Sequence, residues 1–279
     1  MVKNFLTFDI EEWFDRNFQT ELHKGKSRES TLPNDIEKII DICAKYNIRS
    51  TCFIVAKIAE QKPEIVKKLH LAGHEIASHS YEHKLVYNMT PDEFNKDLKK
   101  SCDILQNITG EKVFGYRAPS WSVNENIANW FYDILSENGL KYSSSVYPAK
   151  TYLYGYPEFP EKIHFPLING DKKKILEIPQ SLINILNKKI GFSGGFFFRL
   201  FPFSFIKKQI EKKNKKLQSV FIYLHPYELS FRLKGFELKL LDKFILNYGV
   251  KNCEIKLNKI LSIYKHTFTT MKEYVSNYV

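Results

Sequence analysis

Residues 72–83 read Ala72-Gly73-His74-Glu75-Ile76-Ala77-Ser78-His79-Ser80-Tyr81-Glu82-His83, and this stretch decides the fold class. Its first part is typical of a buried strand that is entered through a glycine turn, and the strand leads to two histidines, His79 and His83. Two imidazoles four residues apart can bind one metal ion if the backbone between them is helical. Because α/β folds build their sites at the carboxyl ends of parallel strands, the stretch predicts a parallel sheet with a metal site at this edge.

An acidic cluster, Thr7-Phe8-Asp9-Ile10-Glu11-Glu12, follows an apolar run at the start of the chain that is typical of a strand. Residues two apart on a strand point to the same side, so Asp9 and Glu11 can face one site. Glu12 points away if the strand stays regular, and it is the alternative metal ligand if the strand end bulges. Two histidines and one carboxylate leave coordination positions open for water and substrate, whereas structural zinc sites are closed by four ligands rich in cysteine. The two segments together therefore suggest an open metal site.

Strand-like and helix-like segments alternate along most of the chain. Repeated βα units imply a parallel sheet with right-handed crossovers, and hence an α/β fold. Thr90-Pro91-Asp92-Glu93 forms a capping box, which fixes the start of one helix. The predicted strands are 5–8, 50–55, 74–77, 113–116, 142–144, 175–178 and 219–224, and the predicted helices are 35–45, 62–71, 91–106, 124–137 and 203–215.

The composition is that of a globular protein, with 43% hydrophobic and 26% charged residues, and the 279 residues suit a single domain over 1–279. A formal net charge of +11 raises the alternative of a nucleic-acid-binding protein, since clustered Lys and Arg attract phosphate. The lysines are instead spread through helical segments without a nucleic-acid-binding motif, so no nucleic-acid partner is expected. A basic surface equally attracts an anionic sugar precursor or the inner surface of a membrane.

The cysteine spacing and the distribution of apolar residues indicate where we expect the protein to be located. The four cysteines are widely scattered, which excludes a zinc–thiolate site and a disulfide framework. The first motif begins too early for a signal peptide, and no apolar stretch has transmembrane length, so we expect a cytoplasmic location. The phenylalanine-rich segment 191–205 is either a buried insertion or a point of peripheral membrane contact. The sequence indicates no oligomeric state.

Three later segments are also apolar runs that end in polar side chains able to take part in catalysis or binding. They are Val113-Phe114-Gly115-Tyr116-Arg117-Ala118-Pro119-Ser120-Trp121, Leu140-Lys141-Tyr142-Ser143-Ser144-Ser145-Val146-Tyr147-Pro148 and Val220-Phe221-Ile222-Tyr223-Leu224-His225-Pro226. In this order the five segments resemble the motifs of the polysaccharide deacetylase (NodB-homology) family, carbohydrate esterase family 4. The resemblance runs from Phe5 to about Leu229, and Phe268-Thr269-Thr270-Met271 resembles the usual family ending. It implies a distorted, incomplete (β/α)7-type barrel.

Within the family the chain is most similar to the subgroup tied to bacterial surface-polysaccharide and exopolysaccharide loci. Four features carry this likeness: Asp9-x-Glu11, Arg117-Ala118-Pro119-Ser120, Ser193-Gly194-Gly195-Phe196-Phe197-Phe198-Arg199-Leu200 and His225-Pro226-Tyr227-Glu228.

The resemblance implies a divalent metal, usually zinc, held by one carboxylate and two histidines, and Glu11, His79 and His83 match these ligands. Asp9 matches the family's catalytic base. The chain departs from the family pattern at Glu11, where most members have Asp. The metal must then lie about one methylene farther from that backbone, or the strand must recede.

The other site residues follow from the same motifs. Arg117 matches the arginine that pairs with the catalytic carboxylate and orients it. The backbone N–H of Ser120 lies near the family position that stabilises the oxyanion. His225 matches the general acid for the leaving amine, with a capped core histidine as the alternative. Trp121 and Tyr147 are the predicted substrate-binding residues, with the ring of Trp121 facing the sugar.

A second departure concerns the environment of His225. Ser143 stands where many relatives carry an Asp before the Ser-Ser pair. This change removes a carboxylate from the pocket and leaves open what tunes His225. Glu177, in Leu176-Glu177-Ile178-Pro179, is the predicted substitute.

The predicted function is removal of the N-acetyl group from a sugar in a bacterial surface-polysaccharide or glycan precursor, catalysed with a divalent metal. Base, acid and ligand residues are all present, which favours an enzyme. Two alternatives remain. O-deacetylation is a variant of the same chemistry, and a catalytically inactive sugar-binding domain of a polysaccharide assembly system is consistent with Glu11 and Ser143 at the two departures.

Overall fold

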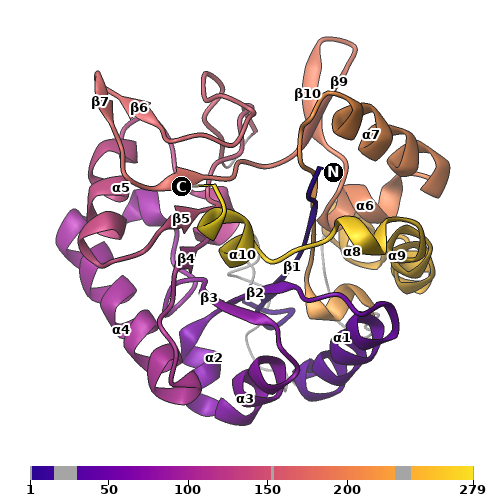
Figure 1. Ribbon diagram of the computed structural model, residues 1–279, viewed down its shortest axis with the longest axis horizontal. Helices are drawn as coiled ribbons and strands as arrows, with labels where there is room; N and C mark the ends of the chain where they lie inside the picture. The colour runs from indigo at the N-terminus through magenta and orange to yellow at the C-terminus, as the bar shows by residue number, and fades with distance from the viewer. Residues whose placement is uncertain (1, 16–29, 152–153, 230–239, 279) are drawn as a thin grey trace.

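The computed structural model describes residues 2–15, 30–151, 154–229 and 240–278. Seven strands form one sheet in the order β11-β1-β2-β3-β4-β5-β8, and every neighbouring pair is parallel. The sheet curls around a centre but β11 and β8 do not pair with each other, so the barrel stays incomplete, as predicted (Figure 1). The strands are β1 (Phe5–Ile10), β2 (Thr51–Ile54), β3 (Glu75–Ser78), β4 (Gly115–Tyr116), β5 (Tyr142–Ser143), β8 (Leu176–Glu177) and β11 (Phe221–Leu224).

Helices surround the curled sheet on its outer side, and among the first five α3 packs next to α1 and α2 next to α4 (Figure 1). The first five are α1 (Leu32–Tyr46), α2 (Ala56–Gln61), α3 (Pro63–Leu71), α4 (Pro91–Thr109) and α5 (Ala128–Glu137), and the later ones are α6 (Gly195–Leu200), α7 (Phe203–Lys215), α8 (Leu240–Asn247), α9 (Val250–Tyr264) and α10 (Met271–Ser276). The 3₁₀ helices are η1 (Val86–Asn88), η2 (Pro119–Trp121), η3 (Pro226–Leu229) and η4 (Lys265–Thr267).

Two small hairpins lie outside the main sheet. In each the strands are antiparallel, and the pairs are β6 (Leu167–Ile168) with β7 (Asp171–Lys172) and β9 (Leu182–Ile185) with β10 (Lys188–Gly191). The predicted capping box is confirmed: the Thr90 backbone N–H donates to Glu93 at 2.8 Å, and the Glu93 N–H donates to the Thr90 hydroxyl at 3.3 Å. This reciprocal pair fixes the start of α4.

Alternation along the strands separates two apolar layers. In β1, Leu6, Phe8 and Ile10 belong to the larger core between the sheet and its helices, whereas Phe5 belongs to an inner cluster with rings from β2 and β11. Because side chains alternate across a strand, Thr7 and Asp9 share the inner side with Phe5. The same parity holds in β11, where Ile222 and Leu224 are outward and Phe221 is inward. The inward-facing side chains of these strands are thus apolar toward the amino ends and polar at the carboxyl ends.

Helix α10 closes the amino ends of the strands, and Met271 and Val275 complete the inner cluster there. The Met271 N–H donates to the Thr51 hydroxyl at 2.9 Å, and the Lys272 N–H donates to the Glu75 carboxylate at 2.9 Å. Tyr142 donates to the other oxygen of Glu75 at 2.7 Å. Burial nevertheless raises the pKa of Glu75. This buried network ties the last described helix to the starts of three strands.

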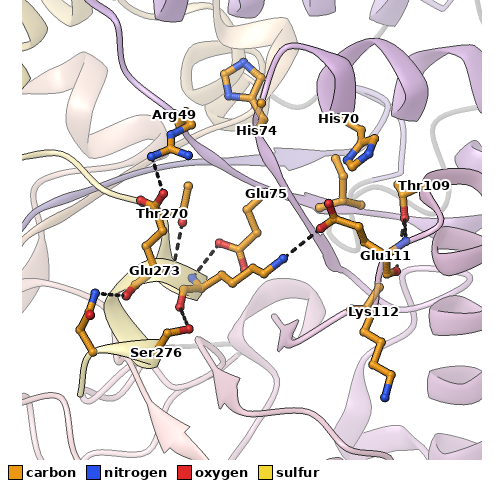
Figure 2. A pocket seen from close by; sticks show the side chains of 15 residues that line it. Arg49, His70, His74, Glu75, Thr109, Glu111, Lys112, Thr270, Glu273 and Ser276 are labelled. Carbon is orange, nitrogen blue, oxygen red and sulfur yellow. Dashed lines mark hydrogen bonds and ion pairs between the residues drawn. The ribbon is translucent and has the colours of Figure 1, made fainter. Parts of the chain in front are cut away.

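A pocket of about 450 Å³ opens beside α10, at the end of the sheet opposite the predicted metal ligands (Figure 2). Two ion pairs lie in its lining, since Arg49 is 2.5 Å from Glu273 and Lys272 is 2.9 Å from Glu111. Figure 2 shows Glu75, on β3, in the middle of the side chains that line this pocket. These pairs hold α10 and its neighbours together.

The phenylalanine-rich segment 191–205 is folded against the barrel. Phe192 and Phe198 are fully buried, and Arg199 is 3% exposed. These contacts agree with a buried insertion, and contact with a membrane stays a prediction. Among the helices of the described residues, none combines the length and the apolar character needed to cross a membrane.

Candidate active site

Three predicted metal ligands meet at the carboxyl ends of β1 and β3. Glu11, His79 and His83 are buried, and one ligand atom of each lies within 4.8 Å of the other two. The Glu11 Oε2 atom is 2.7 Å from Nε2 of His83 and 3.9 Å from Nε2 of His79. The Glu11 N–H donates to the Asp9 carbonyl at 3.1 Å, which ends the strand in a tight turn. The two acidic residues thereby keep to the same inner side.

The segment between the histidines is a loop, so the helical backbone that would suit their four-residue spacing is not what brings them together. Ser80 and His83 have φ of 65° and 58°, in the left-handed region. The His83 N–H donates to the Ser80 hydroxyl at 2.8 Å instead of to the carbonyl four residues earlier. The carbonyls of Ser80 and Tyr81 are taken by the N–H groups of Ala56 and Lys57 at the start of α2, each at 3.0 Å. Contacts with α2 therefore replace a helical turn in setting the histidine spacing.

The donor set fits a divalent ion. The Nδ1 atom of His79 lies 2.8 Å from the Arg117 carbonyl, which places the proton on Nδ1 and leaves Nε2 as the ligand atom. Burial would raise the pKa of Glu11, but the surrounding histidines, His83 foremost, hold it well below its usual range. Burial lowers the pKa of His79 to about 4. Glu11 is therefore a carboxylate and His79 a neutral imidazole near pH 7, the forms that bind metal ions.

Glu12 points away from this centre, toward the start of α3. Its Oε1 atom lies 3.2 Å from Nζ of Lys62 at the start of α3. Its other carboxylate oxygen is buried, and Glu12 is 5% exposed. Of the two neighbouring glutamates, the one that reaches both histidines is Glu11.

Asp9 and Arg117 form a buried ion pair on the same inner side. Nη1 of Arg117 lies 2.5 Å from Oδ1 of Asp9 and 3.0 Å from the Thr7 hydroxyl. The guanidinium is 1% exposed, and it donates to the carbonyl and the hydroxyl of Ser144 at 3.3 and 3.1 Å. Its carbon lies 4.0 Å from the ring centroid of Phe53. Acceptors on three sides fix the guanidinium, which in turn fixes the Asp9 carboxylate that it binds.

His225 follows β11 and faces the same centre from the opposite side. Its Nε2 atom is 3.5 Å from Oε1 of Glu11, the carboxylate oxygen that His83 does not contact. Burial would lower the pKa of His225, but the Glu11 and Glu228 carboxylates outweigh this effect and raise it. The Glu11 carboxylate is thus bracketed by imidazoles from two separate loops.

The carboxylate that binds His225 is Glu228, and the prediction of Glu177 in this role is wrong. Glu177 accepts the N–H groups of Ser145 and Val146 at 2.7 and 3.0 Å and the Tyr132 hydroxyl at 3.2 Å. It therefore holds the loop after β5. The spacing of His225 and Glu228, three residues apart across a proline, was a signal in the sequence that could have identified this pair.

Of the remaining predicted residues, Trp121 and Tyr147 are buried and Ser120 is partly buried. Ser120 and Trp121 have φ of 51° and 53°, so the chain turns sharply after Arg117. Trp121 is 5% exposed and stacks on Phe221 at 5.8 Å between ring centroids, which leaves little of its ring for a sugar. The Tyr147 hydroxyl accepts the Gly191 N–H at 2.9 Å. The substrate contacts predicted for Trp121 and Tyr147, and the oxyanion contact predicted for Ser120, stay predictions.

A shallow pocket of about 270 Å³ lies beside Trp121 on this side of the barrel. Its lining includes Tyr87 from η1, Glu125 before α5 and Tyr154 from the loop after β5. Aromatic and carboxylate groups of this kind are usual neighbours of sugars.

Each half of the chain matches a known protein-family model. Residues 5–143 match the family model described as polysaccharide deacetylase, and residues 144–276 match a model described as a domain of unknown function (DUF3473). The peptidoglycan deacetylase of Helicobacter pylori is 29% identical over 155 residues, which are 52% of this chain and 52% of that protein. The peptidoglycan-N-acetylglucosamine deacetylase of Bacillus cereus is 31% identical over 93 residues, 33% of this chain and 34% of that protein.

The chain thus spans between a third and about half the length of these curated relatives. Among solved structures, a probable polysaccharide deacetylase from Pseudomonas aeruginosa superposes with a TM-score of 0.64 at 16% identity, covering 98% of this chain and 89% of that one. At this identity the likeness concerns the fold alone. A single domain over residues 1–279 stays a prediction.

Proposed function

The chain belongs to the polysaccharide deacetylase family, and from this premise we propose that it removes the N-acetyl group from a sugar in a bacterial surface-polysaccharide or glycan precursor, using a divalent metal and preferably zinc. The names of the relatives support an N-acetylated glycan as substrate, because they are peptidoglycan deacetylases. The acidic opening Asp9-x-Glu11 and the Gly-Gly-aromatic segment resemble the subgroup of surface-polysaccharide loci, which is why we propose that class of precursor.

One observation carries the proposal. The Glu11 carboxylate lies between His83 at 2.7 Å and His225 at 3.5 Å, with the Asp9–Arg117 pair on the same inner side. Hydrolysis of an amide requires a base for the attacking water and an acid for the leaving amine. Asp9 on β1 and His225, which directly follows β11, support this assignment because they are a carboxylate and an imidazole near the same centre.

A divalent ion held by Glu11, His79 and His83 would activate water and polarise the amide carbonyl. Asp9, oriented by Arg117, accepts the proton of the attacking water. As the C–O bond forms, the backbone N–H of Ser120 would donate to the carbonyl oxygen. His225 then gives its proton to the nitrogen while the C–N bond breaks, and acetate and an amine leave.

The experiment that tests the function is an assay for both products. We expect metal-loaded protein to release acetate from an N-acetylated oligosaccharide and to generate one new amine for each acetate, because the proposed cleavage is at the C–N bond. Chelation should stop both, and added zinc should restore both. Acetate without a new amine would make the substrate an ester. No turnover on any N- or O-acetylated sugar of a broad panel would favour an inactive sugar-binding domain.

The metal centre yields a separate prediction. Purified protein supplied with zinc should hold about one ion per chain, and His79→Ala and His83→Ala should each lose it, because two remaining ligands bind zinc weakly. His266→Ala is the matched control, since His266 is exposed on η4 and should leave the content unchanged. Elemental analysis after gel filtration measures the metal content. Retention of the full metal content by both site variants would place the ion elsewhere.

A further inference from the structure

We propose that Glu228 and Arg199 are positioning residues, which hold the ring of His225 with Nε2 facing the Glu11 centre. The proposal rests on the proposed function, in which His225 is the acid. It also accounts for a site that has Ser143 in place of a carboxylate, because a glutamate from η3 supplies the missing group.

The contacts between Glu228 and His225 fix both the backbone and the ring. Oε2 of Glu228 accepts the backbone N–H of His225 at 3.0 Å and lies 2.9 Å from its Nδ1 atom. A carboxylate in this place keeps a proton on Nδ1, and Nε2 is then the nitrogen turned toward Glu11. The ring also stacks on Tyr227 at 5.1 Å with an interplanar angle of 11°, while Tyr223 meets it edge-on at 5.9 Å. Rotation of the imidazole is therefore restricted on several sides.

Arg199 fixes the glutamate in turn. Its Nε atom donates to Oε1 of Glu228 at 2.6 Å, and the two side chains are 0% and 2% exposed. The rest of the guanidinium binds the carboxyl end of α8, donating to the carbonyl of Ile245 at 2.8 Å and to those of Leu246 and Tyr248. An arginine that binds a helix end and a carboxylate together leaves Glu228 little freedom to turn away.

Contacts from α9 fix the backbone at Arg199. Nζ of Lys256 on α9 donates to the carbonyls of Phe198 and Arg199 at 2.8 and 3.0 Å. Gly249, with φ of 71°, packs so closely that an added Cβ would lie 2.8 Å from the Arg199 carbonyl oxygen. The α6, α8 and α9 helices thus converge on the group that holds Glu228.

A contribution to stability alone does not explain why Arg199 and Glu228 form a buried ion pair here. A buried ion pair loses the hydration of both ions, and well-packed apolar residues of similar volume often stabilise a fold as well or better. The carboxylate of this pair is directed at an imidazole of the site. Burial would raise the pKa of Glu228, but Arg199 and His225 lower it to about 2, so the group facing Nδ1 is a carboxylate throughout the physiological range.

The test is Glu228→Gln, which keeps an acceptor for the His225 N–H and loses the charge at Nδ1. We expect kcat to fall by about 10–100-fold with KM and metal content unchanged, the range for residues that orient site groups. Arg199→Lys can still pair with Glu228 but loses the fork to α8, so a smaller fall in kcat and a lower melting temperature are expected. The control is Lys173→Met, which removes another buried charge, one that pairs with the exposed carboxylates of Asp133 and Asp171, and it should leave kcat unchanged.

A second readout does not depend on turnover. In ¹⁵N NMR spectra of zinc-loaded wild type, recorded at a pH where His225 is neutral, the ring should carry its one proton on Nδ1, and Glu228→Gln should shift the population toward the other tautomer or broaden the signal. Wild-type kcat and an unchanged tautomer in Glu228→Gln would overturn the proposal. A fall in kcat matched by loss of metal or of folded protein would also overturn it and indicate a structural role. If wild type hydrolyses no acetylated sugar, the tautomer still reports on positioning, so the two failures are distinguishable.

Discussion

Asp9→Asn is expected to lower kcat for deacetylation by about 10²–10⁴-fold, the usual contribution of a general base. Asparagine has nearly the same shape and still offers an oxygen to Arg117, which lies 2.5 Å from the native carboxylate. It cannot accept the proton of the attacking water. Metal content and melting temperature should therefore remain near those of the wild type, and elemental analysis and calorimetry measure them alongside kcat.

Asp103→Asn is the matched control, because Asp103 is exposed on α4 and should retain full activity. Loss of metal from Asp9→Asn would reverse the assignment. In that case Asp9 would be a ligand, and Glu11 or Glu12 would be the base.

Arg117→Met is expected to lower the free energy of unfolding by about 3–5 kcal/mol, the usual cost of removing one partner of a buried ion pair. Asp9 is 4% exposed, so its charge would remain in the interior without its counter-ion. The Thr7 hydroxyl and the Ser144 groups would also lose their donor. Urea unfolding followed by circular dichroism measures the change.

The double variant Asp9→Asn with Arg117→Met should be more stable than Arg117→Met alone, because no unpaired carboxylate is left inside the barrel. Equal stability of the two variants would show that the loss arises from packing against Phe53 and its neighbouring rings. The double variant therefore separates charge from volume.

The sheet was predictable because its signals are local. Each of the seven strands of the main sheet lies in a predicted strand segment or within two residues of it, and the long apolar runs of β1 and β11 carry the alternation that points Asp9 and His225 inward. The residues of the metal centre were predictable for the same reason, since His79 and Glu11 directly follow strands. The fold class, a distorted and incomplete barrel, is confirmed.

Long-range contacts were not predictable from local patterns. His79 and His83 meet without a helical backbone between them, because Ser80 and His83 adopt left-handed conformations although neither is glycine. The N–H groups at the start of α2 also bind the carbonyls of this loop. Arg199 meets Glu228 across 29 positions of sequence, and neither side chain alone indicates the other. Burial of Trp121 likewise depends on Phe221, on a strand 100 residues further along the chain.

The order of strands in the sheet has a consequence for how the chain is made. β1 lies between β2 and β11, and the Thr7 hydroxyl binds the Ile222 carbonyl, 215 positions later. At synthesis rates of about 5–20 residues per second, β1 waits roughly 10–40 s for this partner to leave the ribosome. One edge of an apolar strand is open throughout that time, and such edges are templates for aggregation. The nascent chain therefore depends on protection, by the ribosome surface or by chaperones, until β11 has been synthesised.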